Sequence, residues 1–292
     1  MNFGRVLTAM VTPFTENGEV DYAEVKRLAA HLVENGNDCL VVCGTTAETP
    51  TLTHEEKVNI VKAVKEAIGG KAAIVVGTGT NSTASTIEAS KEMEALGVDG
   101  LLVVEPYYNK PSQEGMYQHF KAVAEAVSLP IILYNIPGRC GVNMSPDLIA
   151  RLSKIDNIVA VKEAAGSIEQ VSQIRQLVDD DFIIYSGDDS LTLPMMAVGG
   201  YGIISVAGHV VGSQIHAMVD AYAAGNVKEA EAMHRKLYPI FKSLFITSNP
   251  VPVKFALSQL GFGNGKVRLP LVEANDAEKA AVLKTMKDLE LV

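Results

Sequence analysis

The sequence has little of several features that mark particular classes of protein. Its three cysteines, Cys39, Cys43 and Cys140, form no CxxC pair and no even set for disulfides. No apolar run approaches the ~20 residues of a membrane-spanning helix, and the first five residues lack the basic start and apolar core of a signal peptide. We therefore expect a soluble, cytoplasmic protein with reduced thiols.

Clusters of positive charge are also missing. The chain has 25 Lys and Arg against 34 Asp and Glu, a formal net charge of −9, which argues against a nucleic-acid partner. The six histidines are scattered without metal-ligand spacing, so we expect no metal site. An anionic small molecule remains compatible with this composition, because a pocket needs only one or two local cations.

What the sequence does contain is a regular alternation of strand-like and helix-like segments. The apolar, β-branched runs that predict strands are residues 6–11, 39–43, 73–76, 101–104, 131–134, 158–162, 182–185 and 203–206. A helical pattern follows each run, the last of them from about Ser213 to Ala224. Eight such units in the first 225 residues predict an α/β fold, a (β/α)₈ TIM barrel.

Residues 226–292 carry helical patterns only, and we expect them to form a C-terminal helical domain appended to a catalytic barrel of residues 1–225. A doubly wound open sheet is the alternative fold, with Glu105 as a ribose-binding acid. That alternative is weaker, because Gly77-Thr78-Gly79 lacks the later glycine of the dinucleotide fingerprint.

One lysine stands out against this pattern. In the run Ile158-Val159-Ala160-Val161-Lys162-Glu163, period-2 alternation puts Lys162 on the same face as the apolar Ile158 and Ala160. Lysine is rarely buried unpaired, and desolvation would lower its pKa and leave more neutral amine to attack a carbonyl. The plain alternative is that the strand ends here and Lys162 reaches water.

Barrel enzymes place their reactive groups at the carboxyl ends of the strands. The polar residues at those ends are Thr12, Thr45, Thr46, Glu48, Thr78, Tyr107, Tyr108, Tyr134, Asn135, Arg139, Lys162, Glu163 and Asp188. The set has no histidine and so no Ser–His pair for triad hydrolysis. What remains is amine catalysis, with an imine on Lys162 and tyrosines that move protons.

At these positions the sequence resembles the dihydrodipicolinate synthase family of pyruvate-dependent, Schiff-base aldolases, over nearly its whole length. The motifs that carry the resemblance are Gly44-Thr45-Thr46-Ala47-Glu48, Pro106-Tyr107-Tyr108-Asn109-Lys110-Pro111, Tyr134-Asn135-Ile136-Pro137-Gly138-Arg139, Val161-Lys162-Glu163 and Asn249-Pro250-Val251-Pro252-Val253-Lys254. The resemblance implies condensation of pyruvate with L-aspartate 4-semialdehyde to 4-hydroxy-tetrahydrodipicolinate, in lysine and diaminopimelate biosynthesis, with no cofactor.

The resemblance also implies roles for individual residues. Lys162 would form the imine, Tyr134 would be the general acid–base, and Thr45 would link Tyr134 to Tyr108 in a proton relay. In the family this second tyrosine comes from a neighbouring subunit, which implies a homotetramer built as a dimer of dimers. The residues implied to bind substrate are Thr46, Gly187 and Ile204 for pyruvate and Arg139 for the carboxylate of the semialdehyde.

Two departures from the family pattern matter. Ala47 stands where the family usually has glycine, and alanine would be strained there if the position needs positive φ. The positions implied to bind the feedback inhibitor L-lysine are Thr49, Pro50, His54, Lys57, Asn81, Ser85 and Tyr107. Inhibited relatives usually carry histidine at the position of Lys57 and glutamate at that of Ser85, so Coulomb's law predicts weak or absent inhibition.

Two alternative functions remain open from sequence. One is a related pyruvate-dependent enzyme, such as an N-acetylneuraminate lyase or a keto-deoxy-sugar aldolase. The other is a barrel that only binds pyruvate-like acids. Arg139 and the Thr45–Thr46 pair favour the synthase over a sugar aldolase, because a sugar aldehyde offers hydroxyls where the semialdehyde has a carboxylate.

Overall fold

The computed structural model describes residues 3–292. Met1 and Asn2, two of the five residues that lack the pattern of a signal peptide, lie outside the described part. Eight parallel strands follow one another in chain order around a closed barrel. They are β1 (Val6–Ala9), β2 (Cys39–Val42), β3 (Ala73–Gly77), β4 (Gly100–Val104), β5 (Ile131–Asn135), β6 (Ile158–Glu163), β7 (Ile183–Ser186) and β8 (Gly202–Ser205). Helices lie between the strands, and the TIM barrel predicted from the sequence is confirmed.

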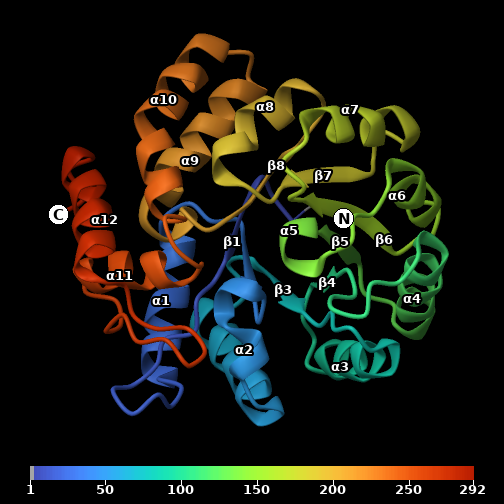
Figure 1. Ribbon diagram of the computed structural model, residues 1–292, viewed down its shortest axis with the longest axis horizontal. Helices are drawn as coiled ribbons and strands as arrows, with labels where there is room; N and C mark the ends of the chain where they lie inside the picture. The colour runs from blue at the N-terminus through green and yellow to red at the C-terminus, as the bar shows by residue number, and fades with distance from the viewer. Residues whose placement is uncertain (1–2) are drawn as a thin grey trace. The chain divides into compact units, whose positions relative to one another are not determined.

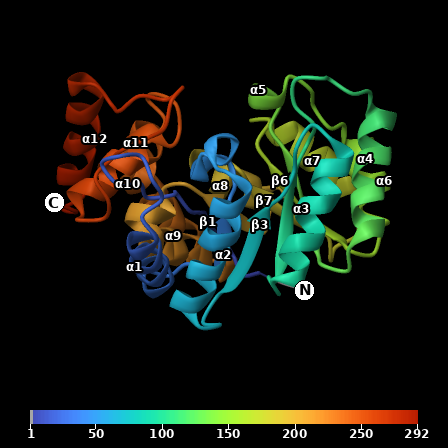
Figure 2. The same ribbon diagram turned by 90° about the horizontal axis from the view of Figure 1, so that it is seen from below.

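The chain divides into two compact units. One unit contains Ala73–Ile204 together with Phe3. Its helical segments are α3 (Thr83–Ala95), α4 (Gln113–Ala126), α5 (Pro137–Cys140), α6 (Pro146–Leu152), α7 (Ile168–Leu177), η3 (Asp189–Leu191) and α8 (Thr192–Ala197). Helices α3, α4, α6 and α7 pack successively against one another (Figures 1 and 2).

The other unit joins Gly4–Ala72 to Ser205–Val292. Its helical segments are α1 (Tyr22–Glu34), η1 (Thr45–Ala47), η2 (Thr49–Thr51), α2 (His54–Ile68), α9 (Gly208–Ala223), α10 (Val227–Ser243), α11 (Val251–Gln259) and α12 (Asp276–Asp288). Helix α10 packs on α9, and α12 packs on both α10 and α11 (Figure 1). The predicted C-terminal helices are therefore present, and the domain boundary at residue 225 stays a prediction.

Local sequence explains most of these element boundaries. β5 is buried along its whole length, as its run of apolar residues predicts for a parallel strand. Thr53 caps α2 in a reciprocal capping box with Glu56. α6 carries Pro146 in its first turn, where a missing N–H costs nothing. Among the described residues no helix is both long and apolar enough to span a membrane.

The start predicted for α9 is wrong, because the helix begins at Gly208, five residues before Ser213. Two glycines in this stretch suggest a turn, but here they allow close packing. A Cβ on Gly208 would clash with the side chain of Thr8, and one on Gly212 would lie 2.5 Å from the carbonyl oxygen of Asn35. The pattern also missed the short segments η1, η2 and α5, which are too brief to show a helical period.

Candidate functional site

Lys162 lies near the carboxyl end of β6 and is 5% exposed. In the β5–β6 register it pairs with Tyr134, and its Nζ lies 4.4 Å from the centroid of the Tyr134 ring. In the β6–β7 register it pairs with Tyr185, which is fully buried. No described residue forms an ion pair with its amine. The alternative in which Lys162 reaches water does not hold.

Burial lowers the pKa of Lys162 from 10.5 to about 8. The Asp189 carboxylate opposes this shift, and the Arg139 guanidinium adds to it. The sequence pattern placed Asp188, and not Asp189, among the polar residues at the strand ends. The Asp188 side chain instead caps η3 by accepting a hydrogen bond from the N–H of Ser190. Asp189 is the buried member of the pair, at 3% exposure.

Gly187 and Ile204 lie at the ends of neighbouring strands. The pairs Tyr185–Gly202 and Ser186–Ile203 fix the β7–β8 register, and Gly187 and Ile204 are the next residues. A Cβ on Gly187 would lie 2.7 Å from that of Ala164 and 3.3 Å from Lys162 Cε, so only glycine fits beside the amine. Its N–H donates to the carbonyl oxygen of Glu163 and is therefore already engaged.

Arg139 and Tyr108 are the exposed members of the predicted set. Arg139 lies on α5, the short helix that follows β5, and no described carboxylate forms an ion pair with its guanidinium. Tyr108 follows β4, is 88% exposed and has a φ of 74°, in the left-handed region that bulky residues rarely adopt. The backbone thus presents this tyrosine outward.

Thr45 and Thr46 lie in η1, in the other unit, at the end of β2. Thr46 is 2% exposed, and its hydroxyl oxygen accepts a hydrogen bond of 2.9 Å from Asn249 Nδ2. Because that oxygen already accepts, the Thr46 O–H proton is free to be donated to a ligand. Thr45 is half-buried, and its predicted contacts with Tyr134 and Tyr108 stay predictions.

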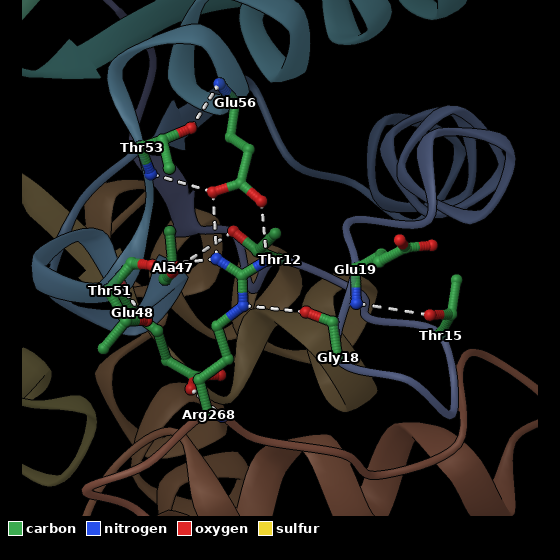
Figure 3. Close-up of polar contacts among 10 residues, drawn as sticks. All are labelled: Thr12, Thr15, Gly18, Glu19, Ala47, Glu48, Thr51, Thr53, Glu56 and Arg268. Carbon is green, nitrogen blue, oxygen red and sulfur yellow. Dashed lines mark hydrogen bonds and ion pairs between the residues drawn. The ribbon is translucent and has the colours of Figure 1, made fainter.

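A second buried charge cluster supports this loop. Glu48 follows η1 with a φ of 57°, and its Oε1 lies 2.6 Å from the Nζ of Lys254. Its Oε2 accepts a hydrogen bond of 2.8 Å from the N–H of Arg268. Figure 3 shows the guanidinium of Arg268 donating to the carbonyl oxygens of Gly18 and Thr51 and to both oxygens of Glu56. The segment after α11 is thereby fastened to the loop that carries Thr45 and Thr46.

Ala47 is not strained. It ends η1 and does not have positive φ; the neighbouring Glu48 does. The carbonyl oxygen of Ala47 accepts a hydrogen bond of 2.9 Å from the Thr12 hydroxyl. The departure from the family glycine thus leaves a regular turn.

The chain is similar along its whole length to proteins of one known family. Residues 2–289 match the model of the dihydrodipicolinate synthetase family. The 4-hydroxy-tetrahydrodipicolinate synthase of Moorella thermoacetica is 60% identical over 292 residues, which cover 100% of both chains. That of Heliobacterium modesticaldum is 57% identical over 291 residues, 100% of this chain and 97% of the relative.

Solved structures lead to the same family. A crystal structure of DHDPS from Cyanidioschyzon merolae with lysine bound has a TM-score of 0.98 and 46% identity and covers 99% of each chain. The dihydrodipicolinate synthase DapA-2 of Bacillus anthracis has a TM-score of 0.96 and 47% identity over 98% of each chain.

Fold and site together define a (β/α)₈-barrel lyase of the pyruvate-dependent, Schiff-base aldolase type. Within this class the chain belongs to the dihydrodipicolinate synthetase family. The lyase class and the synthase function predicted from the sequence, in lysine and diaminopimelate biosynthesis, are confirmed by these relatives.

Proposed function

We propose that this chain condenses pyruvate with L-aspartate 4-semialdehyde, and that Lys162 carries the substrate as an imine. The observation that supports this most directly is the amine itself: buried, without an ion-pair partner among the described residues, and with a pKa lowered to about 8. A lysine of this kind has a useful fraction of neutral nucleophile near neutral pH.

In the first half of the reaction, the neutral amine of Lys162 attacks C2 of pyruvate, and water leaves as the imine forms. Loss of a proton from C3 gives an enamine. We assign the transfer of these protons to Tyr134, whose ring centroid lies 4.4 Å from the Lys162 amine. The protonated imine takes up the electron pair, so no metal or cofactor enters the steps.

In the second half, C3 of the enamine attacks the aldehyde carbon and forms the new carbon–carbon bond. The amino group of the semialdehyde then attacks C2, closes the ring and displaces Lys162. The sum is one pyruvate and one semialdehyde converted to 4-hydroxy-tetrahydrodipicolinate and one water. We assign the carboxylate of pyruvate to the Thr46 hydroxyl, and that of the semialdehyde to Arg139, whose planar guanidinium suits bidentate pairing.

We further propose a homotetramer, a dimer of dimers, in which Tyr108 enters the site of a neighbouring subunit. Its 88% exposure and outward backbone conformation support this role. Sedimentation of the wild-type chain, with activity assays of Tyr108→Phe, tests both parts. The cytoplasmic location stays a prediction.

Borohydride reduction in the presence of pyruvate tests the proposed function. We expect a covalent adduct at Lys162, located by peptide mass spectrometry, and none in Lys162→Ala. A coupled assay then offers aspartate semialdehyde and sugar aldehydes in turn. An adduct without turnover of the semialdehyde, but with turnover of a sugar, would reassign the chain to the sugar aldolases; no adduct at all would leave only a binding protein.

Feedback inhibition by L-lysine should be weak or absent. Ser85 is exposed and brings no charge, and its hydroxyl bonds only to the Ser82 hydroxyl among the described residues. Lys57, the other departing position, adds a cation, so an incoming ammonium group would meet repulsion without a compensating carboxylate. Half-inhibition at sub-millimolar L-lysine would contradict this proposal.

A further inference from the structure

Glu105 is a buried acid that the proposed mechanism does not use. It directly follows β4 and is fully buried. In the β4–β5 register Val104 pairs with Tyr134, so Glu105 stands beside Asn135. Since side chains alternate along a strand, Glu105 lies on the face opposite Tyr134, together with Asn135 and its register partner Glu163. It therefore lies behind the reacting groups.

The contacts of Glu105 span the point where β5 gives way to α5. Its N–H donates to the carbonyl oxygen of Tyr134, at 3.0 Å. Its Oε1 accepts a hydrogen bond of 2.9 Å from the N–H of Ile136. Ile136 is the N-cap residue of α5, and its own carbonyl accepts from the N–H groups of Arg139 and Cys140. Glu105 thus fastens the start of the helix that carries Arg139.

Cys140, at the other end of α5, faces the same carboxyl group. The thiol is buried, and burial together with the nearby Glu105 carboxylate raises the pKa of Cys140 to about 12, so the thiol stays protonated. The second carboxyl oxygen of Glu105, Oε2, is buried without a hydrogen-bond partner among the described residues. An incompletely paired buried acid is costly for stability and calls for an explanation.

We propose that Glu105 is a positioning residue that holds α5 so that Arg139 meets the carboxylate of the aldehyde substrate. Glu105 accepts a hydrogen bond from the N-cap residue of this helix, whereas Arg139 forms no ion pair among the described residues that would fix its position. A small displacement of a binding group can reduce rates about 100-fold. This inference rests on the proposed function, because it takes Arg139 as the residue that binds the aldehyde.

The first test compares Michaelis constants in Glu105→Ala and Glu105→Gln. Removing the acceptor frees Ile136, so we expect Glu105→Ala to raise the KM for the semialdehyde roughly tenfold or more. The kcat and the yield of the pyruvate adduct should stay within about threefold of wild type, because Lys162 is untouched. Glu105→Gln keeps an acceptor for Ile136 and should restore most of the affinity at pH 6.

Glu94 provides a matched control in the same unit. It also accepts a hydrogen bond from a loop N–H next to β5, that of Ser128 at 2.7 Å, but at the amino end of the strand. That end of a barrel contributes to stability rather than to catalysis. Glu94→Ala should lower the melting temperature without changing the KM for the semialdehyde. An equal rise of this KM in Glu94→Ala and Glu105→Ala would reduce Glu105 to a merely structural role.

The pH dependence of the KM for the semialdehyde is a second readout, because a variant that is only destabilised would not change it. Burial, together with the charge of Glu163, raises the pKa of Glu105 to about 7, and the hydrogen bond from the Ile136 N–H and the nearby Cys140 thiol oppose the shift. The charged groups facing this network are Glu163 and, next to Cys140, Arg139. Ionisation strengthens the bond to Ile136, so the wild-type KM for the semialdehyde should fall as pH rises from 6 to 8.

In Glu105→Gln this fall in KM should disappear. A profile identical to wild type would overturn the proposal, even if Glu105→Ala fails to fold. Failure of the proposed function is distinguishable: wild type would then form no pyruvate adduct, or Arg139→Ala would leave the KM for the semialdehyde unchanged. Where both controls behave as expected and the Glu105 variants keep the wild-type KM and pH profile, only the positioning role is lost.

Discussion

Lys162 and Lys254 form a natural comparison between the two units of the chain. Both are almost fully buried, at 5% and 4% exposure. Each amine lies over an aromatic ring, that of Tyr134 at 4.4 Å and that of Phe14 at 4.0 Å. Burial lowers the pKa of both. By burial, ring contact and pKa direction, the two lysines cannot be told apart.

Their partners differ. Lys254 lies 2.6 Å from a carboxylate oxygen of Glu48, whose other oxygen is bonded to the backbone of Arg268. Lys162 has no such pair among the described residues; Asp189 acts on it only as a nearby charge. A paired ammonium is held in place by its carboxylate, whereas an unpaired amine is free to attack once it has lost its proton. Burial is alike at the two lysines, so the missing carboxylate partner marks Lys162 as the nucleophile.

Matched methionine variants give the largest expected effect. Lys162→Met removes the imine-forming group and should lower activity by roughly 10³-fold or more, since covalent catalysis has no substitute amine there. Its thermal stability should stay equal or rise, because a buried unpaired amine is replaced by an apolar chain of similar length. Borohydride labelling should be absent. Residual labelling at another lysine would show that Lys162 is not the sole imine-forming residue.

Lys254→Met should show the opposite pattern. It leaves the Glu48 carboxylate buried and unpaired, and breaking such a pair costs about 3–5 kcal/mol of unfolding free energy, measurable by urea denaturation. The folded fraction should still form the pyruvate adduct at Lys162.

The double variant Lys254→Met/Glu48→Gln is the control for this loss. It removes both charges, keeps an acceptor for the Arg268 N–H, and should recover part of the stability. Loss of the adduct in folded Lys254→Met would show that the two lysines are not functionally distinct.

The pH dependence of kcat/KM for pyruvate should report the protonation state of Lys162. Because the pKa of Lys162 is about 8, the neutral amine becomes about tenfold scarcer for each pH unit below 8. We expect kcat/KM to rise accordingly and to level off above pH 8. Asp189 raises this pKa and Arg139 lowers it, so Asp189→Asn should shift the break to lower pH. A break that stays in place would assign it to another group.

How well the sequence predicts a feature depends on how far apart in the chain the residues that determine this feature lie. The strands were located from short apolar runs, and their order placed Lys162, Tyr134 and Arg139 at strand ends, because a barrel repeats one local unit eight times. No local sequence pattern predicts the β5–β6 register, which pairs Tyr134 with Lys162.

The contacts that support the site were not predictable in the same way. Asn249 donates to Thr46 across 203 positions of the chain, and Arg268 reaches Glu56 across 212. Such pairs have no period or spacing that a single sequence reveals. Glu105 shows the same limit: its side chain suggested a ribose-binding acid, whereas its observed partner is the N–H of Ile136.

Ala47→Gly should give the smallest effect and tests the loop that Lys254 supports. Since Ala47 lies in the turn of η1 without positive φ, glycine relieves no strain there and only adds freedom to the unfolded chain. We expect a loss of about 0.5–1 kcal/mol in unfolding free energy and a KM for pyruvate within about twofold of wild type. A more stable Ala47→Gly variant would show instead that alanine strains this loop, and that the Glu48–Lys254 pair holds it against that strain.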